Sequence, residues 1–134
     1  EPLKAITIEP EPKTEAVFKR DMAHILYDGF DGYPNEKLYD FIFVCHSLEH
    51  CENPLQALRE FNRILNPDGY LFISLPCYCH SHVVSTDKDH IFCFTDWQIG
   101  KLLGYSQYKN VNVFNGDPID DSPHQYNLIA TAQK

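Results

Sequence analysis

The chain has 134 residues, of which 43% are hydrophobic and 22% charged, so it can bury the core of one domain and is too apolar for a disordered tail. It carries 11 basic and 19 acidic residues, a net charge of −8, and no basic cluster longer than Lys19-Arg20. This balance argues against a nucleic-acid partner, because such binding depends on Lys and Arg neutralising phosphates. The longest apolar runs have the length of strands, far below the roughly 20 residues that cross a bilayer, so no membrane partner is expected.

The cysteines and the start of the chain predict a cellular setting. Five cysteines are an odd number and too few for a disulfide framework, which favours free or metal-bound thiols in a reducing cytoplasm. No basic segment followed by an apolar one opens the chain, as a secretory signal would. The chain begins at Glu1 without Met, which indicates a fragment or a processed protein.

The first third of the chain predicts a strand, a helix and a second, weaker strand. Leu3 to Ile8 is apolar and β-branched, and the sequence Glu-Pro-Glu-Pro that follows ends the strand. Thr14 is placed to cap a short helix that reaches about Met22. His24 to Tyr27 is the weaker strand, and it leads into a loop rich in Gly and Asp.

The middle of the chain predicts a strand, a helix and another strand. Tyr39 to Cys45 is nearly all apolar, as in a strand covered on both faces of a parallel sheet. Asn53 is placed as the N-cap of a helix and Pro54 as its first residue. The turn Asn66-Pro67-Asp68-Gly69 ends that helix, and Tyr70 to Leu75 forms the second buried strand. Strand, helix and strand together have the size of a βαβ unit.

The last third predicts one helix and two closing strands. Thr95 and the glutamine three residues later form a capping box, which begins a helix that runs to Leu103. Gly104 is placed as the residue that follows the helix. Lys109 to Asn115 and Tyr126 to Ala132 are the closing strands.

The stretch from Tyr39 to Pro76 resembles the central βαβ unit of class I S-adenosylmethionine-dependent methyltransferases. Asp40 begins the strand, Leu48-Glu49-His50 follows it, Asn53-Pro54 begins the helix, and Arg63 to Gly69 precedes the next strand, each as in that family. The resemblance implies an α/β fold with a Rossmann-like, mostly parallel sheet and a C-terminal antiparallel hairpin. It also implies one domain over residues 1–134 and transfer of a methyl group to a small-molecule acceptor.

The chain departs from this family at its N-terminus. Family members begin with a strand and a Gly-rich loop that contacts the cofactor, and the six glycines of this chain form no such loop. We therefore expect a partial methyltransferase domain that lacks the first βα unit. In the family's strand order 3-2-1-4-5-7-6 the missing strand is central, so either Leu3 to Ile8 pairs directly with Tyr39 to Cys45, or another chain fills the gap, as in a homodimer.

The resemblance also assigns roles in binding S-adenosylmethionine. Glu9 corresponds to the acid that binds the ribose at the end of the family's second strand. Asp28 would stand near the adenine amino group, and Phe30 would pack on the ring. Cys45 and His46 would place backbone groups near the methionine part.

The Cys/His-rich segments contain the candidate catalytic residue and candidate metal ligands. Two alternatives to a working enzyme also remain open. His50 would orient the acceptor or act as its base, which makes it the candidate catalytic residue. One alternative is a non-catalytic remnant that serves as a binding module. The other is a metalloprotein that binds zinc or iron, with His50, Cys77, Cys79 and His82 as the ligands, because these side chains leave two adjacent strands at the same sheet edge.

Overall fold

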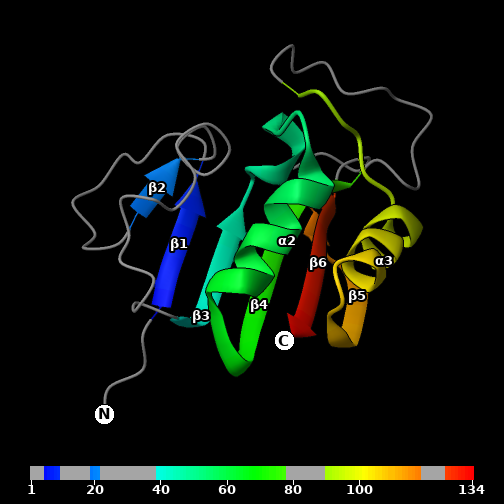
Figure 1. Cartoon of the computed structure of the whole chain (residues 1–134). Coiled ribbons are helices and arrows are strands. Elements are labelled where there is room, and N and C mark those ends of the chain that lie inside the picture. The colour runs from blue at the N-terminus through cyan, green and yellow to red at the C-terminus, as the bar shows by residue number, and fades with distance from the viewer. Residues whose placement is uncertain (1–4, 10–18, 22–38, 78–89, 119–125) are drawn as a thin grey trace.

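The computed structural model of the chain describes residues 5–9, 19–21, 39–77, 90–118 and 126–134 (Figure 1). Its elements in chain order are β1 (Ala5–Glu9), β2 (Lys19–Asp21), β3 (Tyr39–Cys45), a 3-10 helix (Leu48–His50), α2 (Pro54–Ile64), β4 (Leu65–Cys77), α3 (Asp96–Tyr105), β5 (Lys109–Pro118) and β6 (Tyr126–Gln133). The predicted strand at His24 to Tyr27 lies outside the described residues. Neither described α-helix is long and apolar enough to cross a membrane.

The strands form one mixed sheet in the order β2-β1-β3-β4-β6-β5 (Figure 1). β2, β1, β3 and β4 pair in parallel, and β6 is antiparallel to both of its neighbours, β4 and β5. The predicted α/β class, the mostly parallel sheet and the antiparallel C-terminal pair are therefore all present in the structure.

β1 pairs directly with β3, in a register that joins Ala5 to Phe41 and Ile8 to Val44. Of the two arrangements predicted for these strands, this is the one in which the sheet closes without a strand from another chain. No slot remains between β1 and β3, so this part of the sheet gives no reason to require a second copy of the chain.

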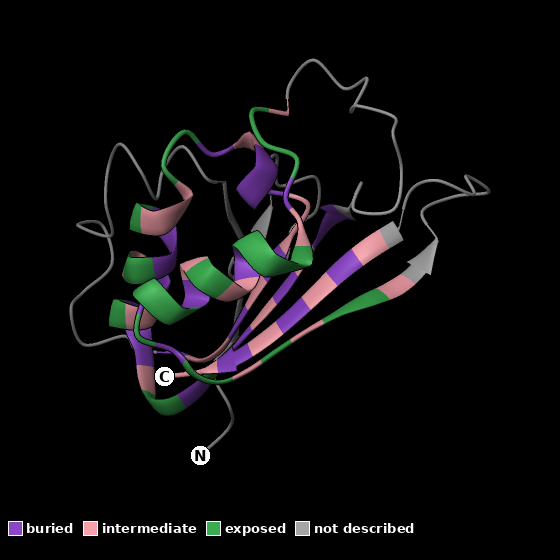
Figure 2. Ribbon diagram, turned by 90° about the vertical axis from the view of Figure 1, so that its right-hand side faces the viewer, coloured by how far each residue is buried: buried purple, intermediate pink, exposed green. Residues whose placement is uncertain are grey.

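α2 and α3 cover the same face of the sheet (Figures 1 and 2). β6 shows the alternation that this one-sided cover produces, since Leu128, Ala130 and Ala132 are buried while the residues between them are only partly so (Figure 2). Phe61 of α2 and Ile99 of α3 are fully buried against the sheet. The core therefore lies between these two helices and the central strands.

The helix predicted from Thr14 to Met22 is wrong at its C-terminal end. Lys19–Asp21 is a strand, β2, which pairs in parallel with Thr7 to Glu9 of β1. Hydrogen bonding to a neighbouring strand overrides the local preference, as tertiary context often does. The N-terminal part of this predicted helix lies outside the described residues.

β4 is longer than the predicted strand and begins where α2 ends, at Leu65. Leu65 pairs with Tyr39, and the predicted turn residues lie inside this irregular start of the strand. Asp68 adopts a left-handed backbone with φ of 63°, and the N–H of Lys134 donates to the Gly69 carbonyl at 2.9 Å. The turn therefore exists, but contacts with β3 and β6 bring it into the sheet.

α3 begins as predicted and ends later than predicted. Thr95 and Gln98 form the reciprocal capping box, but the helix continues past Gly104 to Tyr105. Gln107, with φ of 66°, takes the left-handed conformation expected of the glycine, and its N–H donates to the Gly104 carbonyl at 3.0 Å. A non-glycine residue therefore ends this helix.

Candidate functional site

A buried carboxylate lies just beyond the carboxyl end of β3. Glu49 sits in the middle of the 3-10 helix, and its side chain is 1% exposed. Leu48 and Cys51 on either side of it are buried in the core, which holds the short helix down. Neither carboxylate oxygen of Glu49 has a hydrogen-bond partner among the described residues.

Three histidines surround this carboxylate. Oε1 of Glu49 lies 3.8 Å from Nε2 of His50, 3.8 Å from Nε2 of His90 and 3.9 Å from Nδ1 of His46. The rings of His50 and His90 meet edge to face, with centroids 4.7 Å apart. We call Glu49, His46, His50 and His90 the Glu/His cluster.

Hydrogen bonds fix the orientation of His46. Its Nε2 lies 2.9 Å from Oδ1 of Asn127 on β6, and this amide oxygen can only accept a hydrogen bond. Nε2 therefore carries the hydrogen, and in the neutral ring Nδ1 turns a lone pair toward Glu49. The backbone N–H of His46 donates to the Ser74 carbonyl at 2.7 Å, which ties the loop to β4.

The backbone of Glu49 holds His90 in place. The Glu49 carbonyl accepts hydrogen bonds from the N–H groups of Ile91, at 2.8 Å, and Phe92, at 3.1 Å. These bonds anchor the segment that carries His90 directly beside the carboxylate, although the two residues are far apart in sequence.

Burial is the main electrostatic influence on the cluster. It raises the pKa of the Glu49 carboxyl above its ordinary value, because the charged form loses its hydration, and the Glu49 backbone amide and then the nearby histidines oppose this effect in part. A buried carboxyl among imidazoles can relay a proton, stabilise a charged imidazole or bind a cation.

The structure brings together two of the predicted site residues. His46 and His50 both belong to the cluster, and Cys45 ends β3 directly before them. Glu9 ends β1 at the same sheet edge, because its neighbour Ile8 pairs with Val44, the neighbour of Cys45. Asp28, Phe30, Cys79 and His82 lie outside the described residues, and of Cys77 only the backbone, at the end of β4, is described.

Two members of the cluster were not among the predicted site residues. Glu49 follows the buried strand within Leu48-Glu49-His50, so its position was visible in the sequence, but its burial was not. His90 is the fourth member, and no spacing rule links it to Glu49. The hydrogen bonds from the segment after His90 to the Glu49 carbonyl form only in the folded chain.

The carboxyl end of β1 fits only part of S-adenosylmethionine. The Glu9 carboxylate suits the two ribose hydroxyls, since it can accept both protons. Pro10 and Pro12 follow it in the sequence, and neither proline has a backbone N–H to offer the methionine carboxylate. The N–H of His46 is likewise engaged by Ser74.

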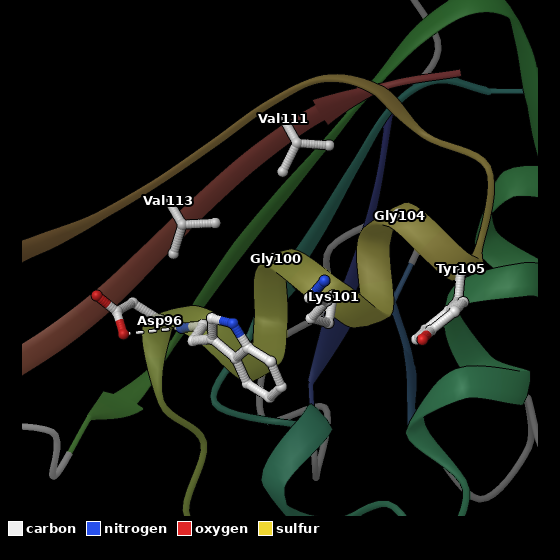
Figure 3. Close-up of a pocket in the computed structure, with 8 residues that line it drawn as sticks. Asp96, Gly100, Lys101, Gly104, Tyr105, Val111 and Val113 are labelled. Atoms are coloured by element: carbon white, nitrogen blue, oxygen red, sulfur yellow. Dashed lines mark hydrogen bonds between the residues drawn. The ribbon is translucent and has the colours of Figure 1, made fainter.

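Two hollows flank α3 and lie apart from the Glu/His cluster. One, of about 760 Å³, runs between α3 and β5 and is lined by residues such as Trp97, Lys101 and Val113 (Figure 3). The other, of about 430 Å³, lies between the start of α2 and α3, and Phe92 and Phe94 are among its lining residues. The backbone N–H of Phe92 also donates a hydrogen bond to the Glu49 carbonyl, so Phe92 both lines the second hollow and contacts the cluster.

Comparison with known proteins identifies the fold. A methyltransferase of Thermotoga maritima, described as S-adenosylmethionine-dependent, is 14% identical to this chain, with a TM-score of 0.67. The match covers 100% of this chain and 83% of the Thermotoga chain. A second S-adenosylmethionine-dependent methyltransferase, from Archaeoglobus fulgidus, is 12% identical, with a TM-score of 0.64. The match covers 97% of this chain and 85% of the Archaeoglobus chain. At such identities the likeness shows a shared fold.

The match to longer enzymes is partial. Phosphoethanolamine N-methyltransferase 2 of Haemonchus contortus, solved with S-adenosyl-L-methionine, is 13% identical with a TM-score of 0.61 over 75% of this chain. This chain spans only about a third of that enzyme's length, 34%. Among curated proteins none matches the chain in sequence.

The family itself is shown by the sequence. The family described as methyltransferase domain matches residues 2–128, nearly the whole chain and most of its described strands and helices. The fold shared with the Thermotoga and Archaeoglobus enzymes agrees with this match. The chain therefore belongs to the methyltransferase domain family.

Proposed function

We propose that this protein binds S-adenosylmethionine and takes part in methyl transfer to a small-molecule acceptor at the carboxyl edge of its sheet. The observation that carries the proposal is a family match across residues 2–128 together with a Glu/His cluster at the end of β3. Ligands of open α/β sheets bind at this edge. When bound, S-adenosylmethionine supplies an activated methyl group, so the protein needs mainly to position and deprotonate the acceptor.

The binding roles follow the family resemblance. Glu9 holds the ribose hydroxyls, Asp28 lies near the adenine amino group, and Phe30 packs on the ring. Cys45 and His46 border the methionine part, because Cys45 ends β3 beside the end of β1 and His46 follows it. These assignments are proposals for the residues of this chain, and the direct pairing of β1 with β3 supports the nearness of Glu9 to Cys45.

His50 is the proposed base for the acceptor. Its side chain is 25% exposed, so an acceptor can reach it from solvent. A proton taken up by the imidazole is stabilised by the Glu49 carboxylate, whose Oε1 lies 3.8 Å from Nε2. The hollow lined by Phe92 and Phe94 suits an acceptor with an apolar part, since the two rings stack with centroids 5.4 Å apart.

Calorimetry with S-adenosylhomocysteine and S-adenosylmethionine tests the binding step. Without a row of loop amides, we expect weak binding, because each neutral hydrogen bond lost removes about 0.5–1.5 kcal/mol. Glu9→Ala should abolish the remaining binding, whereas Glu52→Ala, which removes an exposed carboxylate, should leave it unchanged. Tight binding that Glu9→Ala leaves intact would show that the ribose site lies elsewhere.

The same measurement decides between an enzyme and a remnant. If neither ligand binds at millimolar concentration, methyl transfer by this chain alone is excluded, and a non-catalytic binding module is the better description. If S-adenosylmethionine binds, His50→Gln should lower methyl transfer to an acceptor without changing the affinity for S-adenosylhomocysteine.

A further inference from the structure

The burial of the Glu49 side chain carries a free-energy cost that no hydrogen bond from the described residues offsets. Its side chain is 1% exposed, and neither oxygen accepts a hydrogen bond from a described residue. A buried polar group without a hydrogen-bond partner destabilises the folded state, and a charged group does so more strongly. Such a group calls for a missing partner, which can be an ion.

We propose that Glu49, His50 and His90 bind a divalent transition-metal ion of the zinc or iron(II) class. In this metal-bound state His50 is a ligand and does not serve as the base for the acceptor. These three side chains each offer one ligand atom, and the three atoms lie within 4.8 Å of one another. The site is distinct from the cysteine-containing set expected from the sequence, with which it shares only His50.

The distances are close to those of a bound ion. Oε1 of Glu49 lies 3.8 Å from Nε2 of both His50 and His90. Ligands about 2.0–2.1 Å from a tetrahedral zinc are ~3.3 Å apart. Both of these pairs therefore need to close by about half an ångström, which side-chain rotation can supply.

The donor types select the class of metal. Two imidazole nitrogens and one carboxylate oxygen are the protein ligands of many catalytic zinc sites and of non-haem iron(II) sites. Calcium and magnesium prefer oxygen ligands, so this set discriminates against them. Three protein ligands leave coordination positions for water or a substrate oxygen.

The surroundings place the open positions on one side. His90 is 10% exposed and Glu49 1%, whereas the side chain of His46 is 43% exposed. The lone pair on Nδ1 of His46 faces the same Glu49 oxygen, since Asn127 holds the opposite nitrogen. His46 thus marks the solvent side of the site, where a metal-bound water would find an acceptor for its hydrogen bond.

The backbone segments that carry the ligands are anchored before any metal binds. The core residues Leu48 and Cys51 anchor the 3-10 helix that carries Glu49 and His50. The Glu49 carbonyl accepts from Ile91 and Phe92, which anchors His90. Preorganised ligands lose little conformational freedom on binding, which favours affinity.

Calorimetric titration of the chelator-treated full chain with zinc and cobalt(II), with magnesium as the comparison ion, tests the site. We expect one zinc or cobalt ion per chain and much weaker magnesium binding. Glu49→Gln and His90→Ala should each weaken zinc binding by roughly a hundredfold or more, because each removes a direct ligand. Glu52→Gln is the matched control, since it changes an exposed carboxylate three residues away.

Thermal unfolding in chelator separates loss of the ligand from loss of the fold. Glu49→Gln removes a buried charge and should therefore leave the melting temperature unchanged or raised without metal. Zinc should raise the melting temperature of the wild type and of Glu52→Gln, but not that of Glu49→Gln.

The cobalt(II) spectrum identifies the donor atoms. Nitrogen and oxygen ligation gives weak visible bands without a thiolate charge-transfer band in the near ultraviolet, and this is the expected result. A strong thiolate band would overturn the proposal in favour of cysteine ligands. Absence of zinc binding, or zinc binding that Glu49→Gln and His90→Ala leave unchanged, would also overturn it.

Discussion

His46 shows how a single residue turns the chain from the sheet into the site. Its φ of 46° lies in the left-handed region, which costs a residue with a Cβ about 1 kcal/mol or more. The hydrogen bond from its N–H to the Ser74 carbonyl and the contact of its ring with Asn127 offset that cost. This conformation stands between the end of β3 at Cys45 and the 3-10 helix that carries the buried Glu49.

Two cysteines on either side of the cluster should differ sharply in reactivity. Cys51 is buried, and burial raises the pKa of its thiol to about 11, whereas Cys93 is exposed. At pH 8 we expect iodoacetamide to modify Cys93 much faster, since the thiolate is the nucleophile and Cys51 is also shielded from the reagent. Peptide mass spectrometry over a time course measures both sites.

The control for this labelling is the same reaction in urea. Cys51 should then react at a rate close to that of Cys93, because unfolding removes both burial and the raised pKa. Fast modification of Cys51 in the folded protein would show that the 3-10 helix opens readily and that the site beside it is not preorganised.

At the scale of elements, two glycines should respond to alanine in opposite ways. Gly104 lies inside α3 with no atom within 4 Å of an added Cβ, whereas a Cβ on Gly69 would lie 2.9 Å from the Asn66 carbonyl oxygen. Gly104→Ala should raise the free energy of unfolding by about 0.5–1 kcal/mol through helix propensity. Gly69→Ala should lower the free energy of unfolding by about 1–3 kcal/mol, because the backbone at Asn66 would have to move to make room for the Cβ.

Urea denaturation monitored by circular dichroism checks both glycine variants. A Gly104→Ala protein that is less stable than the wild type would mean that the face of α3 beside β5 packs more tightly than its hollow indicates. A neutral Gly69→Ala would mean that the turn before β4 adapts freely.

Local signals predicted the elements that depend on neighbours in sequence. The N-cap at Asn53, which accepts from the Gln56 N–H at 3.1 Å, and the capping box at Thr95 are both present, and Tyr39–Cys45 has its predicted bounds. Such features need only a few adjacent residues. β2 and the first part of β4 were missed because they form only by pairing with β1 and β3.

The candidate site divides in the same way. His46 and His50 could be predicted, since they follow a buried strand and the carboxyl ends of parallel strands carry the ligands. The approach of His90 to Glu49 could not, because it depends on two amides that bond to the Glu49 carbonyl across a long stretch of chain. The burial of Glu49 likewise depends on tertiary packing, since the 3-10 helix that carries it contacts α2 and contributes Leu48 to the core.

At the scale of the whole molecule, the charge predicts which partners are excluded. With a net charge of −8 the protein should not be retained by heparin or by a DNA duplex at physiological salt, since binding to such polyanions depends on a surplus of Lys and Arg. Fluorescence anisotropy with a labelled duplex measures this. Micromolar binding at that salt concentration would reveal a basic face that the overall balance hides.

The position of β6 between β4 and β5 has a consequence for how the protein is made. β6 comes last in the sequence among the described strands, yet it is inserted between β4 and β5. While a ribosome is still synthesising it, residues Tyr70 to Cys77 of β4 lack the eight pairings that β6 will provide, and β5 lacks its neighbour in the sheet. A nascent chain at that stage presents an open strand edge, the kind of surface that promotes aggregation. We therefore expect the nascent chain to engage chaperones until Tyr126 to Gln133 has emerged.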